Sequence, residues 1–159
     1  MGDVRVRLLE PDDWQVYREV RLRMLQDSPD AFASRYEQAV HRDEGAWREV
    51  LTACDQHLAE VDGQPVGAAG LVLNEEEANL IGMWVAPETR GSDAGDRLVE
   101  AVCARAADLG HRRVLLDVVE GNDRARRFYE RCGFADTGRR QLVPGRDDAW
   151  EDQMARELR

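Results

Sequence analysis

The fold is decided by one stretch of the sequence, Val85-Ala86-Pro87-Glu88-Thr89-Arg90-Gly91-Ser92-Asp93-Ala94-Gly95-Asp96-Arg97-Leu98. It reads as the end of an apolar strand, a tight loop and the start of an amphipathic helix. Glycine in such a loop lets the backbone approach a ligand closely. The first turn of a helix also leaves backbone N–H groups unpaired, and these groups favour anions. The stretch therefore predicts a cradle for phosphate groups.

The residues before this stretch predict strands and helices in an irregular order. Alternation of apolar and polar residues indicates a half-buried strand, and apolar spacing of three and four indicates a helix. Runs of apolar residues separated by turn residues indicate a meander of strands. The expected elements are a strand at 4–8, helices at 11–25 and 43–53, and strands at 57–61, 66–73 and 79–85.

The residues after the stretch predict a return to alternating helices and strands. A long apolar stripe predicts a helix that Gly110 ends, and Gly133 ends a second helix that Asn122 or Asp123 begins. These elements are a helix at 94–109, a strand at 114–119, a helix from 122 to 132, and closing strands from 134 and at 150–158. The order predicts a mixed α/β fold and not a regularly alternating doubly wound sheet.

Length and composition limit the possible classes of protein. A chain of 159 residues fits a single domain over 1–159. It contains no apolar run long enough for a membrane span and no apolar signal region, so we expect a cytoplasmic protein without a membrane partner. The three cysteines form no C-x-x-C pair and the three histidines have no ligand spacing, so we expect neither disulfides nor a metal site.

The charge of the chain bears on its partners. The formal net charge is −10, which argues against nucleic acid as a partner because phosphate backbones require concentrated positive charge. A cationic partner is the more natural expectation, although such a charge can also belong to an ordinary solvated surface.

Two segments together resemble the GNAT superfamily of acyl-coenzyme A-dependent N-acyltransferases. Arg90-Gly91-Ser92-Asp93-Ala94-Gly95 is similar to the family's Arg-Gly-x-Gly-x-Gly loop, which binds the coenzyme pyrophosphate. The segment Asn122-Asp123-Arg124-Ala125-Arg126-Arg127-Phe128-Tyr129-Glu130-Arg131-Cys132-Gly133-Phe134 is similar to the family's Asn-x-x-Ala-x-x-x-Tyr-x-x-x-Gly-Phe pattern. Either motif alone is weak, but their order and separation also fit the family.

This resemblance implies a GNAT-like domain whose mostly antiparallel central sheet has about six to seven strands and is flanked by about four helices. It implies acetyl-CoA as cosubstrate and a primary amine on a small molecule or a peptide N-terminus as acceptor, and a homodimer is a common arrangement in the family. The implied coenzyme-binding residues are Met83, Trp84, Val85, Arg90, Gly91, Ser92, Asp93, Ala94, Gly95, Asp96, Asn122 and Tyr129.

The resemblance also suggests which residues carry the chemistry. Tyr129 corresponds to the family tyrosine that protonates the departing coenzyme sulfur, although its place on an apolar helix stripe also suits a buried core residue. Many members carry a catalytic glutamate at the start of the strand where this chain has Asn79, which cannot accept a proton. Glu77, just before it, is the candidate general base, and Glu75, Glu76, Glu60 and His57 are alternatives.

Asp93 departs from the family pattern, which has glycine at this position. A carboxylate there can repel pyrophosphate, can cap the helix, or can point to solvent. The leading interpretation is an N-acetyltransferase in which the amine attacks the thioester directly within a ternary complex, without a nucleophilic cysteine. The alternative is a catalytically weak coenzyme A-binding or regulatory domain.

Overall fold

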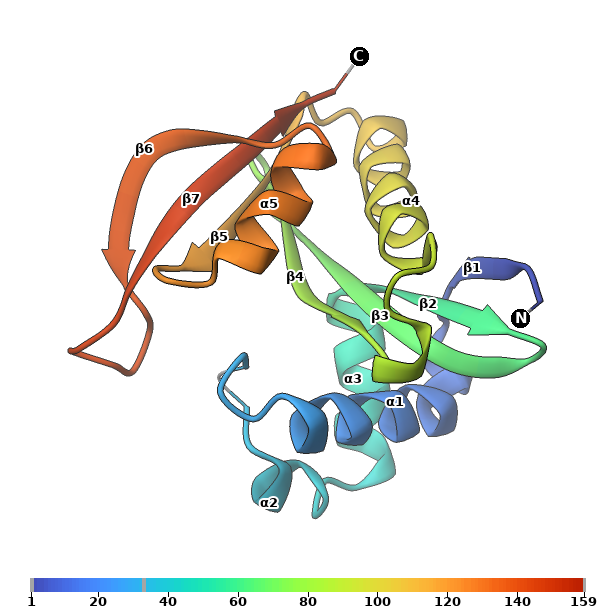
Figure 1. Cartoon of the computed structure of the whole chain (residues 1–159). Helices are drawn as coiled ribbons and strands as arrows, with labels where there is room; N and C mark the ends of the chain where they lie inside the picture. The colour runs from blue at the N-terminus through green and yellow to red at the C-terminus, as the bar shows by residue number, and fades with distance from the viewer. Residues whose placement is uncertain (1, 33, 159) are drawn as a thin grey trace.

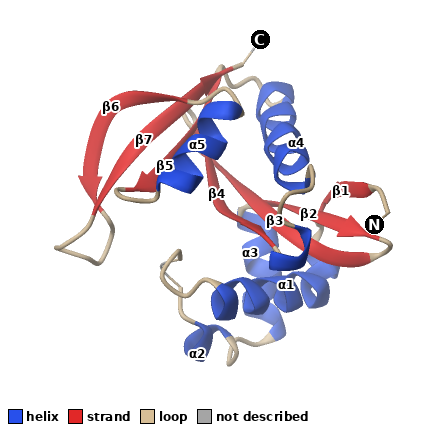
Figure 2. Ribbon diagram, in the orientation of Figure 1, coloured by secondary structure: helices blue, strands red, loops and turns tan. Residues whose placement is uncertain are grey.

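The protein is described by a computed structural model that covers residues 2–32 and 34–158. One sheet runs through the molecule, with α1 and α3 against one face and α4 against the other (Figure 1). Figure 2 shows the same arrangement by type of element, with a long hairpin projecting to one side. The mixed α/β fold expected from the sequence is confirmed.

The strands and helices follow the order expected from the sequence, with one additional helix. The strands are β1 (Val4–Leu8), β2 (Asp55–Val61), β3 (Gln64–Leu73), β4 (Ala78–Val85), β5 (Arg113–Val119), β6 (Ala135–Leu142) and β7 (Trp150–Glu157). The helices are α1 (Trp14–Asp27), α2 (Tyr36–Ala39), α3 (Glu44–Ala53), α4 (Ala94–Asp108) and α5 (Asp123–Arg131), with short 3-10 turns at Pro11–Asp13 and Pro87–Thr89.

The sheet has seven strands in the order β1-β2-β3-β4-β5-β7-β6. All neighbouring pairs are antiparallel except β4 and β5, which run parallel. This parallel pair is short, since only Ala78 with Val114 and Asn79 with Leu115 are in register. Beyond these pairs the two strands separate, and we call the space between them the β4–β5 opening. Because β4 pairs with β3 on its other side, some of its backbone groups face the opening without a strand partner.

Side-chain alternation assigns residues to the two faces of the sheet. Asp55 of β2 forms an ion pair with Arg105 of α4, so Asp55 and its cross-strand neighbours Leu71 and Leu80 face α4. The next residues along each strand therefore lie on the opposite face, which we call the α1 face. They include Gln56, Gly70, Ile81 and, through the parallel register, Leu115 and Asp117.

The core forms between the α4 face of the sheet and α4, and between the α1 face and α1 and α3. Leu98 and Val102 of α4 are completely buried, as expected from the helical stripe, and so is Val99, whereas Leu109 at the end of that stripe is exposed. Trp47 of α3 is also completely buried and meets Tyr17 of α1 edge to face, with ring centroids 5.9 Å apart. These contacts fix α1 and α3 beneath the sheet.

Three features differ from the sequence-based expectation. The irregular segment before Asp43 contains α2, a single turn that raises the number of helices from four to five. In β4, Gly82 has a φ of +55° and lies at a bulge against β3, a break that strand periodicity did not predict. All eight residues of β6 are exposed, because the β6–β7 hairpin extends away from the core (Figure 1).

Candidate active site

The loop before α4 has the conformation of a short turn that leads directly into the helix. Gly91 has a φ of +90°, a conformation in which a side chain is strained. The Ser92 hydroxyl donates to the carbonyl of Thr89 at 2.6 Å and accepts from the N–H of Ala94 at 3.2 Å. Ser92 thus acts as the side-chain cap of the helix, and its hydroxyl is occupied by the loop itself.

Four backbone N–H groups in this loop and in the first turn of α4 remain available for a ligand. Within the described parts of the chain, the N–H groups of Gly91, Asp93, Gly95 and Asp96 have no hydrogen-bond acceptor. They are concentrated at the N-terminus of α4, a helix of 15 residues whose dipole adds partial positive charge there. This set of donors fits the phosphate groups of a coenzyme.

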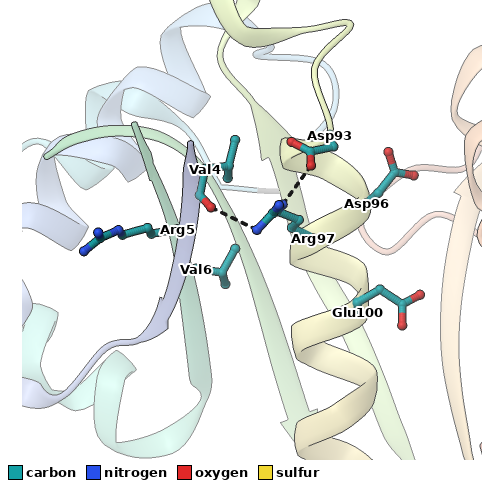
Figure 3. Close-up of a pocket in the computed structure, with 7 residues that line it drawn as sticks. All are labelled: Val4, Arg5, Val6, Asp93, Asp96, Arg97 and Glu100. Carbon is teal, nitrogen blue, oxygen red and sulfur yellow. Dashed lines mark hydrogen bonds and ion pairs between the residues drawn. The ribbon is translucent and has the colours of Figure 1, made fainter. Parts of the chain in front are cut away.

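Asp93 is the first residue of the turn into α4, but its carboxylate does not cap the helix. Its φ is −87°, which suits any residue, and no backbone N–H donates to its side chain. The carboxylate instead binds Arg97 at 2.8 Å, and Arg97 also donates to the carbonyl of Val4 in β1 at 3.2 Å (Figure 3). The negative charge at residue 93 is therefore balanced on the β1 side of α4.

Figure 3 also shows the hollow around this ion pair, which has a volume of about 590 Å³. Asp96 and Glu100 add two more carboxylates to its lining. The hollow lies between α4 and the edge strand β1, which β2 and β3 separate from β4 in the sheet. It therefore lies outside the β4–β5 opening, and its acidic lining does not suit a phosphate.

Charge variants of this ion pair should change the affinity for acetyl-CoA in opposite directions. Asp93→Gly should lower the dissociation constant about two- to fivefold because it leaves Arg97 unbalanced, and Arg97→Ala should raise it by a similar factor. The double variant restores neutrality and should bind within about twofold of the original chain. Calorimetry at low salt measures all three. Unchanged affinity in both single variants would show that Asp93 does not influence the site.

Arg90 has a structural role in addition to any role in binding. Its Nη2 donates to Asp27 at 2.7 Å and its Nε donates to the carbonyl of Val85 at 3.0 Å. Asp27 also accepts from the indole N–H of Trp84 at 2.8 Å, and this bond is the main cause that holds the pKa of Asp27 below its usual value. The carboxylate of Asp27 thus links the end of α1 to the end of β4 and to the loop before α4.

The strand residues expected at the coenzyme lie beside the β4–β5 opening. Trp84 is buried towards α1, where the guanidinium of Arg23 stacks on its ring at 5.3 Å, whereas the side chain of Met83 reaches Gly95 at the start of α4. A Cβ atom on Gly95 would lie 3.0 Å from the ring of Phe128 in α5. Glycine at position 95 therefore allows α4 and α5 to approach each other next to the opening.

The two residues expected on α5 are both part of this region. Asn122 caps α5, because its side chain accepts from the N–H of Ala125 at 3.2 Å. Tyr129 packs between Phe128 and Phe134, with ring centroids 5.3 and 5.8 Å away. Burial raises the pKa of Tyr129, which keeps it a protonated donor.

The structure does not bring Glu77 to the opening. Glu77 precedes β4 and lies in the turn that Asn74 stabilises, on the side where β4 and β5 are still paired. At about 3.3 Å per residue, six strand residues place it roughly 20 Å from Met83.

A different carboxylate, Asp117, lies on β5, the strand that borders the opening, and the sequence analysis did not single it out. Asp117 follows Leu115, the last residue of β5 paired with β4, by two positions, and it lies on the α1 face at the level of Ile81. Asp117 is exposed, but partial burial of its carboxylate, followed by the negative charge of Glu151, raises its pKa, while Arg139 acts against this. A carboxylate with a raised pKa can accept a proton from an amine. The signal in the sequence was a lone charge inside the apolar run Val114–Val119.

The cysteines do not have the properties of nucleophiles. Burial raises the pKa of Cys54, Cys103 and Cys132 to about 11 in each case, so their thiolate forms are rare near neutral pH. Within residues 2–32 and 34–158 there is no group of three or more potential metal-ligating side chains. No helix in the same part of the chain combines the length and apolar character needed to cross a membrane.

The splayed parallel strands and the unpaired N–H groups near them define a mixed α/β protein with a helix terminus that suits an anion. A family model described as the acetyltransferase (GNAT) family matches residues 17–134. The chain therefore belongs to the GNAT acetyltransferase family, and the resemblance seen in the sequence is confirmed.

Individual relatives agree with this assignment. An uncharacterised N-acetyltransferase of Mycobacterium tuberculosis is 37% identical over 112 residues, which cover 70% of this chain and 68% of that protein. An aminoglycoside N(6')-acetyltransferase of Stenotrophomonas maltophilia is 29% identical over 143 residues, covering 84% and 88%. The crystal structure of PaiA N-acetyltransferase from Thermoplasma acidophilum in complex with coenzyme A has the same fold, with a TM-score of 0.72, 17% identity and coverage of 98% and 99%.

Proposed function

We propose that this chain is one N-acetyltransferase domain that transfers an acetyl group from acetyl-CoA to a primary amine. The observation that carries this proposal is the set of free N–H groups at Gly91, Asp93, Gly95 and Asp96, directly beside the β4–β5 opening. The names of the relatives as N-acetyltransferases and the coenzyme A bound to a protein of the same fold support it.

The residues of the chain suit direct attack by the amine. Acetyl-CoA supplies the acetyl thioester; the amine nitrogen forms a bond to its carbonyl carbon, the carbon–sulfur bond breaks, and the sulfur gains a proton. The N–H groups of the loop before α4 hold the phosphates, and β4 lies along the opening towards them. Tyr129 donates a proton to the sulfur, and a carboxylate accepts the proton that the amine loses. The high pKa values of the cysteines argue against a covalent acyl-enzyme.

The test is release of free thiol from acetyl-CoA in the presence of a panel of amines, with the acetylated amine identified by mass spectrometry. We expect thiol release to depend on one or more amines and to equal the acetylated product. Tight binding of acetyl-CoA in calorimetry without turnover of any amine would instead support a coenzyme A-binding domain without this activity.

The same assay identifies the proton acceptor by comparing Asp117→Asn with Glu77→Gln. We expect Asp117→Asn to lower kcat about 100-fold and to remove the acidic limb of the pH–rate profile. The limb arises because activity falls as the pH drops through the raised pKa of Asp117, where the carboxylate becomes protonated. A larger loss in Glu77→Gln, with a displaced acidic limb, would assign the role to Glu77.

A further inference from the structure

Two arginines of the helical segments before β2 have no carboxylate partner among the described residues. Within the described residues, neither Arg21 of α1 nor Arg42, which follows α2, forms a salt bridge or donates a side-chain hydrogen bond, although the chain has 32 acidic residues. Each guanidinium instead lies on an aromatic ring: Arg21 over Phe32 and Arg42 over Trp47, both at 5.3 Å from the ring centroid. Stacking of this kind holds a guanidinium in place while its edge N–H groups stay free.

These two arginines belong to one polar corner, which we call the Arg21–Arg42 corner: Tyr17, Arg21, Arg42 and Cys54. Tyr17 is one helical turn before Arg21, and its ring contacts Trp47, on which Arg42 lies. Burial raises the pKa of Tyr17, and both guanidinium charges act in the opposite direction. Arg21 also acts on the Cys54 thiol, next to the start of β2. The two guanidinium charges of the corner therefore act on the same buried tyrosine.

The corner lies next to the bulge of β4. A Cβ atom on Gly82 would be 3.3 Å from Nη1 of Arg21, so the guanidinium reaches the strand at the residue with a φ of +55°. Gly82 is directly followed by Met83, whose side chain reaches the start of α4. A substrate group that binds Arg21 would therefore lie close to the β4–β5 opening.

Apolar surface continues from the corner along the same face of the sheet. Ile81 and Val72 are 43% and 37% exposed, although both lie on central strands. Both belong to the α1 face, since Val72 is opposite Asn79 and Ile81 is opposite Gly70. An acceptor at this place meets cationic groups, a small apolar surface and, across the opening, the carboxylate of Asp117.

We infer that the acceptor of the proposed acetyl transfer is a small amine that also carries a carboxylate, an α-amino acid with an apolar side chain, whose carboxylate binds Arg21 with support from Arg42. This inference rests on the proposed function and names its substrate class. The amine then points towards the opening and the side chain lies on Ile81 and Val72. The overall charge of −10 had favoured a cationic partner, but the charges that line this face matter more than the sum over the surface.

The experiment compares leucine with leucinamide, which keeps the amine and the side chain but lacks the carboxylate. We expect kcat/KM for leucine to exceed that for leucinamide about 10- to 100-fold, with most of the difference in KM. Arg21→Gln should reduce this ratio to near one, and Arg42→Gln should reduce it partly. Arg112→Gln, an exposed arginine after α4, is the matched control and should keep the ratio.

A binding measurement makes the result independent of turnover. N-acetylleucine and N-acetylleucinamide are titrated into the original chain and into Arg21→Gln, whose thermal midpoint is checked first. Tighter binding of the acid by the original chain alone supports the inference. Equal binding of acid and amide overturns it, as does an acid preference that survives Arg21→Gln.

The turnover assay separates this inference from the proposed function. Turnover of leucinamide, an aminoglycoside or aminoethyl phosphate at the rate of leucine would overturn the substrate class while leaving the proposed function intact. Thiol release with no amine would count against the proposed function itself.

Discussion

Replacing Gly95 by leucine should raise the dissociation constant for acetyl-CoA at least about 100-fold, a loss of about 2.7 kcal/mol in binding free energy. A Cβ atom at this position already lies 3.0 Å from Cζ and 3.2 Å from Cε1 of Phe128, and 3.6 Å from the Met83 side chain. A leucine side chain must occupy the space beside the β4–β5 opening or push α5 away from α4. Either change moves the free N–H groups of Gly95 and Asp96 relative to a bound phosphate.

Overpacking also affects folding, so stability must be measured separately. We expect Gly95→Leu to lose about 1–3 kcal/mol in free energy of unfolding. Ala104→Leu places the same side chain on an exposed position of the same helix and should change neither stability nor affinity noticeably. Gly95→Ala should give an intermediate loss of affinity, although alanine favours a helix over glycine. Wild-type affinity in a folded Gly95→Leu protein would show that the coenzyme does not approach this part of α4.

The local sequence predicted most of the elements because each element has its own local signals. The stripe of Leu98, Val102 and Ala106 predicted α4, and all three residues are buried in the structure. Gly110 and Gly133 have φ values of +91° and +95° just after α4 and α5, as helix-ending glycines do. The single turn of α2 carries no such pattern, because four residues are too few for helical periodicity to show.

The bulge at Gly82 depends on pairing between strands, and the sequence of β4 alone does not contain that information. Its glycine is compatible with an ordinary strand, a bulge or a close contact. Only the register against β3 reveals the extra residue, and only the position of α1 reveals that Arg21 fills the space left by the missing side chain. The contact between Arg21 and the bulge could not be predicted for the same reason.

The loop that we propose for coenzyme binding was easier to find, because its residues are close together in the sequence. The loop at Arg90–Asp96 leads directly into α4, and its free N–H groups follow from the geometry of any helix start. The proton acceptor that we propose was harder to find. Counting along one strand led to Glu77, whereas Asp117 lies on a second strand and is related to β4 only through the parallel register.

Replacing Tyr129 by phenylalanine should lower kcat about 100- to 1000-fold and leave the dissociation constant for acetyl-CoA nearly unchanged. The variant removes one hydroxyl and keeps the ring, so the contacts with Phe128 and Phe134 remain. Because burial raises the pKa of Tyr129, its phenol remains protonated at every pH used in the assay. It can therefore stabilise a departing sulfur as a donor, a role that phenylalanine cannot take.

The competing view is that Tyr129 is only a packed core residue, and kinetics can separate the two. A packing role predicts that Tyr129→Phe changes the free energy of unfolding more than kcat. A donor role predicts the reverse, and it also predicts that an acetyl thioester with a more acidic thiol recovers most of the rate, since a better leaving group needs less help from a proton donor. Tyr36→Phe, on the half-buried turn of α2, serves as the matched control and should retain full activity. Full activity of Tyr129→Phe with the natural thioester would require a solvent molecule or another group to protonate the sulfur.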